Sequence, residues 1–273
     1  MTALHTENAT LAWEKNVISS DLSVEIPSGA FTAIIGPNGC GKSTLLKSFA
    51  RILKPSQGAV FLGEADVNGM ASRDVAKQLA LLPQSTVTPA DISVEELVRR
   101  GRYPHQSLLK PWSAEDARAV EAAMVAAQVA GLAEERVAEL SGGQRQRVWL
   151  AMVLAQNTPV LLLDEPTTYL DISHQYSLLE LAKALVTQLD RTVVAVLHDL
   201  QQAIRYADHL VVMKDGKVVA EGGPAEVVTS ELIQDVFGIS VGVHEVEGQV
   251  VVLPAALPTP DVGVIEKAPA NRG

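Results

Sequence analysis

Residues 36–44 read Gly-Pro-Asn-Gly-Cys-Gly-Lys-Ser-Thr, which has the glycine spacing and the Lys-Ser pair of a phosphate-binding loop. Glycines allow successive backbone N–H groups to curl around phosphate oxygens. Lys42 is expected to reach the β- and γ-phosphates, and the Ser43 hydroxyl is expected to ligate Mg²⁺. Cys40 is interpreted as a small filler residue. The predicted nucleotide-binding set is Gly36, Pro37, Asn38, Gly39, Cys40, Gly41, Lys42, Ser43 and Thr44.

Two acidic residues, Asp164 and Glu165, directly follow the apolar run of residues 160–163. Carboxylates at the exit of a buried strand are costly unless they have a use. Asp164 is predicted to anchor Mg²⁺, and Glu165 is predicted to act as the general base that polarises an attacking water. The alternative is a strand that simply emerges into solvent, and proximity to the phosphate loop counts against it.

The elements that must position these groups form a strand–helix–strand pattern. Residues 31–35, 160–163 and 192–197 are short, β-branched, apolar runs typical of buried parallel strands, and apolar residues recur at helical spacing between positions 178 and 189. Residues 45–53 are predicted to form the helix after the loop. The pattern indicates a parallel α/β sheet. His198 lies where the last strand ends, although a single histidine there could also be purely structural.

Two further regions have different patterns. Residues 89–155 are almost all helical in pattern, with Ser93 and Glu96 at capping-box spacing, and are predicted to form a lobe inserted in the sheet core. Residues 210–214 and 217–221 flank Asp215-Gly216, which predicts a β-hairpin. The Pro- and Ala-rich residues 254–273 are predicted to form a poorly ordered tail.

Composition restricts the partners. The chain has 273 residues, one cysteine and a net charge of −10, so it can form no intrachain disulfide and nucleic-acid binding is not expected. Residues 1–10 lack the pattern of a secretory signal. No stretch approaches the roughly 20 apolar residues that span a bilayer. A membrane role therefore has to come through a partner.

Leu140-Ser141-Gly142-Gly143-Gln144 identifies a family, because this LSGGQ segment resembles the signature of the ATP-binding cassette (ABC) proteins. A helix that begins just after Ser141 would offer N–H groups and a positive dipole end to an anion. An ordinary capped helix start would explain Ser141 and Gln144 but neither of the two glycines.

Other ABC elements follow in the family's order. Gln84 matches the Q-loop glutamine, which the family uses in catalysis and at Mg²⁺, Asp171 matches the D-loop, and His198 matches the switch histidine that senses the γ-phosphate. Trp13 occupies the place of the aromatic residue that stacks on adenine. The alternative for Trp13 is a buried core tryptophan, and the glycine that often follows this aromatic is Glu14 here.

The resemblance implies a P-loop NTPase (RecA-like) α/β core with an N-terminal antiparallel β subdomain and an inserted α-helical subdomain. On that basis the ABC domain spans residues 8–240, with its helical part at about 89–157, and residues 241–273 form a C-terminal extension. The resemblance also implies ATP and Mg²⁺ as ligands and a head-to-tail homodimer. Ser141, Gly142, Gly143 and Gln144 would then contact nucleotide in trans.

Residues 103–106, 110–113 and 167–175 are similar to the ATPase subunits of bacterial ferric-siderophore importers, a group that includes haem and cobalamin importers. This likeness implies two permease subunits, an indirectly associated periplasmic or lipid-anchored binding protein, and a peripheral position on the cytoplasmic face of the inner membrane. An apolar-rimmed docking groove is expected near residues 84–103. The alternatives are haem or cobalamin import, a soluble ABC ATPase, and a non-hydrolysing scaffold, which would need a broken site.

Overall fold

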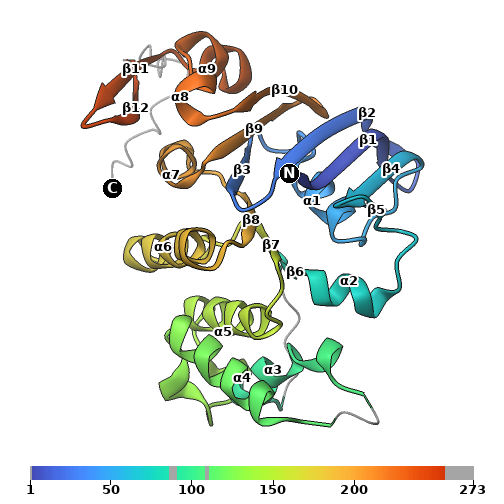
Figure 1. Cartoon of the computed structure of the whole chain (residues 1–273). Coiled ribbons are helices and arrows are strands. Elements are labelled where there is room, and N and C mark those ends of the chain that lie inside the picture. The colour runs from blue at the N-terminus through green and yellow to red at the C-terminus, as the bar shows by residue number, and fades with distance from the viewer. Residues whose placement is uncertain (1, 86–90, 108–110, 256–273) are drawn as a thin grey trace, which may run out of the picture.

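The computed structural model describes residues 2–85, 91–107 and 111–255. Its centre is a six-stranded sheet with the order β10-β9-β3-β8-β7-β6 (Figure 1). Strands β6, β7, β8, β3 and β9 run parallel, and β10 is antiparallel to β9. The strands are β3 (Phe31–Ile35), β6 (Leu79–Leu82), β7 (Val160–Asp164), β8 (Thr192–Val196), β9 (His209–Lys214) and β10 (Lys217–Gly222).

Both faces of this sheet are covered, as parallel strands require. In β3, Phe31, Ala33 and Ile35 pack with α6 (Ile172–Leu189) and α7 (Leu200–Tyr206). The intervening Ile34 packs on the opposite face with α1 (Lys42–Phe49). The predicted strands 31–35, 160–163 and 192–197 are confirmed, and their uniform burial explains why they lack a polar alternation.

A second, antiparallel sheet lies beside α1, in the order β2-β1-β4-β5 (Figure 1). Its strands are β1 (Thr2–Trp13), β2 (Asn16–Pro27), β4 (Gln57–Leu62) and β5 (Ala65–Asp66). The helix α2 (Ser72–Gln78) leads from it back to the central sheet. The expected α/β core with an N-terminal antiparallel subdomain is therefore confirmed.

The helical lobe contains α3 (Val94–Arg100), α4 (Ala114–Ala126) and α5 (Gly142–Ala155), with a core of its own. The short 3₁₀ turns η1 (Tyr103–His105), η2 (Ala130–Leu132) and η3 (Val137–Glu139) connect them. The predicted capping box of Ser93 and Glu96 opens α3. Among the buried polar groups of the lobe, Arg102 Nε donates to Asp116 Oδ1 at 2.8 Å.

The C-terminal extension is more ordered than expected at its start. After α8 (Pro224–Val227) and α9 (Ser230–Phe237), β11 (Val241–Val246) and β12 (Gln249–Pro254) form a hairpin. Pro254 belongs to β12, so the prediction of a poorly ordered tail is wrong at this residue. Pro254 has no N–H to donate, and the next residue, Ala255, donates its N–H to the Ser240 carbonyl at 2.8 Å. Proline is therefore tolerated at the end of this strand. Residues 256–273 of that prediction lie outside the described residues.

Backbone conformation sets two further boundaries. The helix predicted at residues 45–53 is α1, which starts at Lys42 and ends at Phe49 because Arg51 adopts a left-handed conformation with φ of 59°. The predicted hairpin turn between β9 and β10 is confirmed, with φ of 48° at Asp215 and 77° at Gly216. Across the described ranges, none of the helices has the length and apolar character needed to cross a membrane.

Candidate active site

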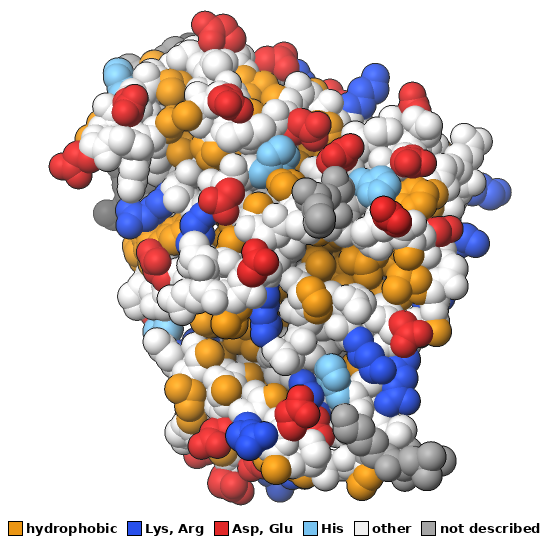
Figure 2. Space-filling view, viewed as in Figure 1, with side chains coloured by type: hydrophobic (Ala, Val, Ile, Leu, Met, Phe, Trp, Pro, Cys, Tyr) orange, Lys and Arg blue, Asp and Glu red, His pale blue; other side chains and the backbone are white. Residues whose placement is uncertain are grey.

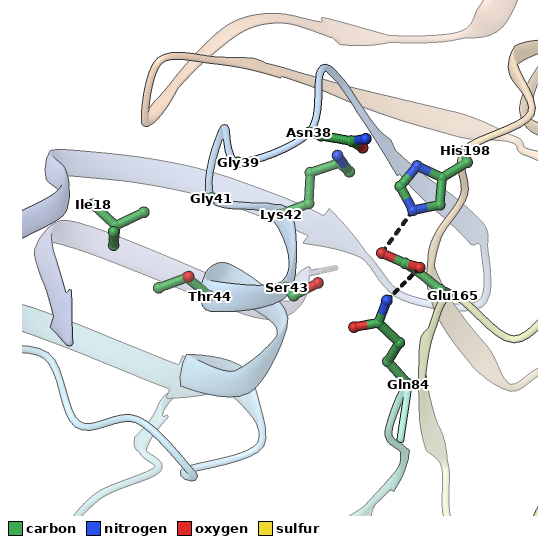
Figure 3. A pocket seen from close by; sticks show the side chains of 10 residues that line it. All are labelled: Ile18, Asn38, Gly39, Gly41, Lys42, Ser43, Thr44, Gln84, Glu165 and His198. Carbon is green, nitrogen blue, oxygen red and sulfur yellow. Dashed lines mark hydrogen bonds and ion pairs between the residues drawn. The ribbon is translucent and has the colours of Figure 1, made fainter. Parts of the chain in front are cut away.

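The candidate site is a cavity of about 460 Å³ at the carboxyl edge of the central sheet. Gly36 follows β3, Gln84 follows β6, Asp164 ends β7, and His198 follows β8. Because these strands are parallel, their carboxyl ends meet at one edge. The lining side chains face one another across the opening (Figure 3): Ile18, Asn38, Gly39, Gly41, Lys42, Ser43, Thr44, Gln84, Glu165 and His198.

At two positions of the phosphate loop, the backbone adopts a conformation that only glycine tolerates. Gly36 has φ of 148°, and a Cβ there would lie 2.1 Å from the Met213 carbonyl oxygen. Gly41 has φ of 104° and is the N-cap residue of α1. The Lys42 ammonium donates to the carbonyls of Gly36 and Pro37 at 2.8 and 2.9 Å, so its charge lies inside the loop.

Cys40 faces the protein interior under this loop and is 4% exposed. Burial raises the pKa of its thiol, so the group stays neutral and weakly nucleophilic. Its packing fits the interpretation of Cys40 as a small filler residue.

Ser43 and Asp164 meet on the floor of the site. The Ser43 hydroxyl donates to Asp164 Oδ1 at 2.7 Å, and Lys47 Nζ lies 3.9 Å from Asp164 Oδ2. Asp164 is fully buried, and this burial raises the pKa of its carboxyl despite the opposing effects of Ser43 and Lys47. Its Oδ2 accepts no hydrogen bond from any described residue.

Glu165 lies between two partners (Figure 3). Gln84 Nε2 donates to Glu165 Oε2, and His198 Nε2 lies against Glu165 Oε1, both at 2.6 Å. The strand order explains this contact, because β7 lies between β6 and β8. Glu165 has φ of 52°, which turns the chain sharply at the end of β7. Its carboxylate is thereby held by two neighbouring strands at once.

Trp13 lies at the outer end of the same site. Its Nε1 donates to Thr44 Oγ1 at 3.3 Å, and Lys47 Nζ is 5.7 Å from its ring centroid. The residue is 43% exposed. The alternative of a buried core tryptophan is therefore wrong, and the indole offers a free surface beside the phosphate loop.

The signature segment lies elsewhere, outside the cavity lining. Ser141 is the N-cap of α5 and exchanges capping-box hydrogen bonds with Gln144. Gly142 is exposed at the helix start, and a Cβ at Gly143 would lie 3.5 Å from Leu170 and the Tyr169 carbonyl. The first turn of α5 is therefore exposed at Gly142, while at Gly143 it packs on Tyr169 and Leu170.

Asp171 caps the neighbouring helix α6. Its Oδ1 accepts from the His174 amide at 2.9 Å and lies 2.7 Å from His174 Nδ1. These two contacts with His174 lower the pKa of the Asp171 carboxyl. Beside it, Tyr169 and Ile172 are 76% and 73% exposed, so the D-loop segment presents apolar side chains to the surface.

A groove of about 590 Å³ lies on the helical lobe near residues 91–112, close to where a docking groove was expected. The expectation of an apolar rim is wrong, because half of its lining residues are charged. The Arg99 guanidinium lies over the Trp112 ring, with its carbon 4.1 Å from the ring centroid. The Arg99 side chain therefore covers apolar surface of Trp112. In Figure 2, acidic and basic side chains are intermixed with apolar ones on the lobe. The lining is Asp91, Ile92, Glu96, Arg99, Arg100, Tyr103, Gln106 and Trp112.

Two site residues were missed from the sequence. Lys47 contacts both Asp164 and Trp13, and its position one helical turn after Ser43 is the signal that could have found it. Ile18 lines the cavity from β2, and no chemical signal marks an isoleucine in advance.

Comparison with known proteins gives a consistent result. Residues 19–168 match the family model described as "ABC transporter". The chain is 54% identical over 236 residues to the ferric enterobactin transport ATP-binding protein FepC of Escherichia coli (strain K12), covering 86% of this chain and 87% of that protein. It is 50% identical over 240 residues to the probable siderophore transport system ATP-binding protein YusV of Bacillus subtilis (strain 168), covering 88% and 87%.

A solved structure agrees in fold. The dimeric structure of MJ0796, described as a bacterial ABC transporter cassette, is similar with a TM-score of 0.74 and 27% sequence identity. The match covers 81% of this chain and 98% of that chain.

Proposed function

The chain belongs to the ABC transporter ATPase family, and we propose that it hydrolyses ATP to power import of a ferric siderophore complex across the bacterial inner membrane. The observation that carries the ATPase assignment is the Glu165 carboxylate, held between Gln84 and His198 at the mouth of the phosphate-loop cavity. A carboxylate so placed has the geometry of a general base.

ATP binding is assigned to the loop and to Trp13. The backbone N–H groups of residues 38–44 and the Lys42 ammonium receive the phosphates, and the positive end of α1 adds to their attraction. Trp13 supplies an exposed aromatic face for the adenine ring, at the end of the site away from Glu165.

The floor of the site fits Mg²⁺. Asp164 Oδ2 is a buried carboxylate oxygen that accepts no hydrogen bond from the described residues, and Ser43 Oγ lies against the other oxygen. Hard oxygen donors of this kind suit Mg²⁺. Ser43, Asp164 and Gln84 would hold the ion, which when bound supplies positive charge that offsets the charge developing on the phosphate oxygens.

Hydrolysis follows from what the chain's own groups do. Glu165 accepts a proton from the attacking water and so increases its nucleophilicity. His198 fixes one carboxylate oxygen and Gln84 the other, so that the base does not swing away. Lys42 places positive charge beside the transferred phosphate.

A second copy of the chain completes the site. Ser141, Gly142, Gly143 and Gln144 lie outside the cavity lining and present an exposed helix start to the surface, as a residue set that acts in trans would. Tyr169 and Leu170, which precede Asp171, lie against this segment. ATP bound between two copies in a head-to-tail homodimer would close the interface, and loss of the γ-phosphate would release it.

The membrane partners are two permease subunits, which bind peripherally attached ATPase subunits on the cytoplasmic face. The groove on the helical lobe, whose lining includes Arg99 and Trp112, is the docking surface that we assign to them. Its mixed charges would select a partner helix of complementary pattern. A periplasmic or lipid-anchored binding protein would deliver the cargo to the permeases.

The cargo assignment depends on the relatives. Their names specify ferric enterobactin and siderophore transport, and the identities of 54% and 50% span most of both chains. Within the described residues, no group of three or more His, Cys, Asp or Glu side chains could hold a metal ion. We therefore place cargo recognition on the partner proteins.

The test is uptake in cells that lack this chain. Restoring the chain should restore accumulation of a radiolabelled ferric catecholate, citrate or hydroxamate complex, while Lys42→Ala should not. Affinity purification of the chain from membranes should recover two hydrophobic permeases. Uptake of haem or cobalamin alone would contradict the cargo, and a membrane-free particle without permeases would contradict the transport role.

A further inference from the structure

Two glutamine side chains connect the D-loop segment, residues 169–171, to the helix that follows His198. Gln175 lies in the first turn of α6 and Gln202 in the first turn of α7. Together they form a continuous series of hydrogen bonds, which we call the amide relay. It runs on the α6 side of the sheet, and its residues lie outside the lining of the nucleotide cavity.

The relay begins at a constrained backbone position. Gln175 Nε2 donates to the Leu170 carbonyl at 3.0 Å. Leu170 is 8% exposed and follows Tyr169, whose φ of 69° lies in the left-handed region. A displacement of the D-loop segment must therefore move Gln175 or break this bond.

The relay ends next to His198. The Gln202 side chain donates from Nε2 to Gln175 Oε1 at 2.8 Å, and the Gln202 backbone N–H donates to Asp199 Oδ1, the cap of α7, also at 2.8 Å. Asp199 directly follows His198, whose Nε2 lies 2.6 Å from Glu165 Oε1. The start of α7 is thus hydrogen-bonded to Gln175 through the Gln202 side chain, and His198 directly precedes the residue that caps this helix.

The energetics favour a specific role for Gln202. It is 5% exposed, and its Oε1 accepts no hydrogen bond from the residues that the structure describes. A buried amide with an unsatisfied oxygen costs stability, so an apolar residue would be the cheaper filler there. The hydrogen bond that the Gln202 side chain does make is the one that it donates to Gln175.

We propose that Gln175 and Gln202 are positioning residues that transmit the position of the D-loop segment to His198 and so set the orientation of Glu165. Tyr169 and Ile172 are exposed beside the Leu170 carbonyl, so a second copy of the chain that packs on them would act on the relay. The inference rests on the proposed function, because it requires that His198 orient the base.

The first experiment measures steady-state ATP hydrolysis of Gln175→Met, Gln202→Met and the double variant. Methionine keeps the length of glutamine and removes its hydrogen bonds. Each single variant should lower kcat about three- to tenfold with the KM for ATP changed less than twofold. Because both residues serve one relay, the double variant should match the worse single variant. Losses that multiply would overturn the relay.

Two further variants separate the relay from a packing effect. Gln175→Glu keeps the acceptor for Gln202 but cannot donate to Leu170, and it should lower kcat as Gln175→Met does. Gln188 lies on the last turn of the same helix, and its exposed side chain makes no hydrogen bond to a described residue. Gln188→Met should therefore leave kcat unchanged. Normal turnover of Gln175→Glu would contradict transmission from the D-loop.

The second experiment reads His198 directly in the nucleotide-free protein. With ¹³C-labelled histidine, the Cε1–H signal of His198, assigned by its loss in His198→Gln, should shift in Gln175→Met and stay in place in Gln188→Met. An unchanged signal in Gln175→Met would overturn the inference. This readout is independent of turnover, whereas full activity of His198→Gln would instead contradict the proposed role of His198.

Discussion

The carboxylates of Asp164 and Glu165 are neighbours in sequence but have opposite surroundings. Asp164 is fully buried at the end of β7, while the chain turns at Glu165 and carries its side chain to the cavity mouth between Gln84 and His198. Burial raises the pKa of Asp164. Two residues adjacent in sequence therefore supply the buried carboxylate that we assign to Mg²⁺ and the carboxylate at the rim that we propose as the base.

The first prediction concerns the cost of burying Asp164. Because its folded pKa is raised, the ionised carboxylate lowers stability at neutral pH, and this cost disappears when the group is protonated. Asp164→Asn should raise the free energy of unfolding of the nucleotide-free protein at pH 7.5 by about 1 kcal/mol. Urea unfolding at several pH values measures it.

The pH dependence of that difference has a fixed sign. The gain in the variant should shrink as the pH falls through the raised pKa toward 3.8, the ordinary value for aspartate, because the wild-type carboxyl becomes neutral. Thr168→Ser, on the loop after β7, serves as the control without a charge change. A variant less stable than wild type at pH 7.5 would contradict the cost of burial.

At the scale of elements, the buried strands and the turns between them could be predicted because their signals are local. Continuous apolar runs identified β3, β7 and β8, and Asp215-Gly216 identified the hairpin of β9 and β10. The roles of Gln175 and Gln202 could not be predicted, because a glutamine carries no signal until the fold brings two helices together. The charged rim of the lobe groove could not be predicted either, because Arg99 and Trp112 come together only in the fold.

The second prediction concerns the helical lobe, where the ion pair of Arg102 and Asp116 connects the end of α3 to the start of α4. Both residues are at least 96% buried, and Arg102 also donates to the Ala155 carbonyl at 2.8 Å. Arg102→Met leaves a buried carboxylate unpaired and should cost about 3 kcal/mol of unfolding free energy. Thermal and urea unfolding measure the loss.

The exposed pair of Arg136 and Asp91 is the matched control for that variant. Arg136→Met should cost less than about 1 kcal/mol, because solvent screens an exposed pair. Equal losses of unfolding free energy in the two variants would show that burial does not determine how much an ion pair contributes to stability.

At the scale of the whole molecule, the nucleotide cavity and the signature segment of one chain are separate, as the proposed two-copy site requires. The chain and the dimeric cassette structure share their fold at a TM-score of 0.74. In the sequence, only the resemblance of the signature residues to the ABC family indicated that the site is divided between two copies, since no local pattern reveals a symmetric partner. The C-terminal hairpin, which meets α7 through Gln201 bonds to Val250 and Val252, was likewise not apparent in the sequence.

The third prediction concerns ATP-driven dimerisation. Glu165→Gln should bind ATP without hydrolysing it and so accumulate as a dimer, with a mass twice the 29.0 kDa of the chain. Adding Ser141→Arg to this variant should return it to the monomer, because the new side chain obstructs the interface while the phosphate loop stays intact. Light scattering with and without ATP measures both. An ATP-dependent dimer that survives Ser141→Arg would contradict the trans arrangement.

The turnover of Glu165→Gln tests the central claim most directly. The variant keeps the shape of the side chain but replaces one carboxylate oxygen with an NH₂ group and so removes the base. Steady-state ATP hydrolysis should therefore fall by roughly 10²–10⁴ with ATP affinity retained. Glu121→Gln, an exposed change on α4, should hydrolyse ATP at the wild-type rate. Near-normal turnover of Glu165→Gln would contradict the assignment of Glu165 as the base.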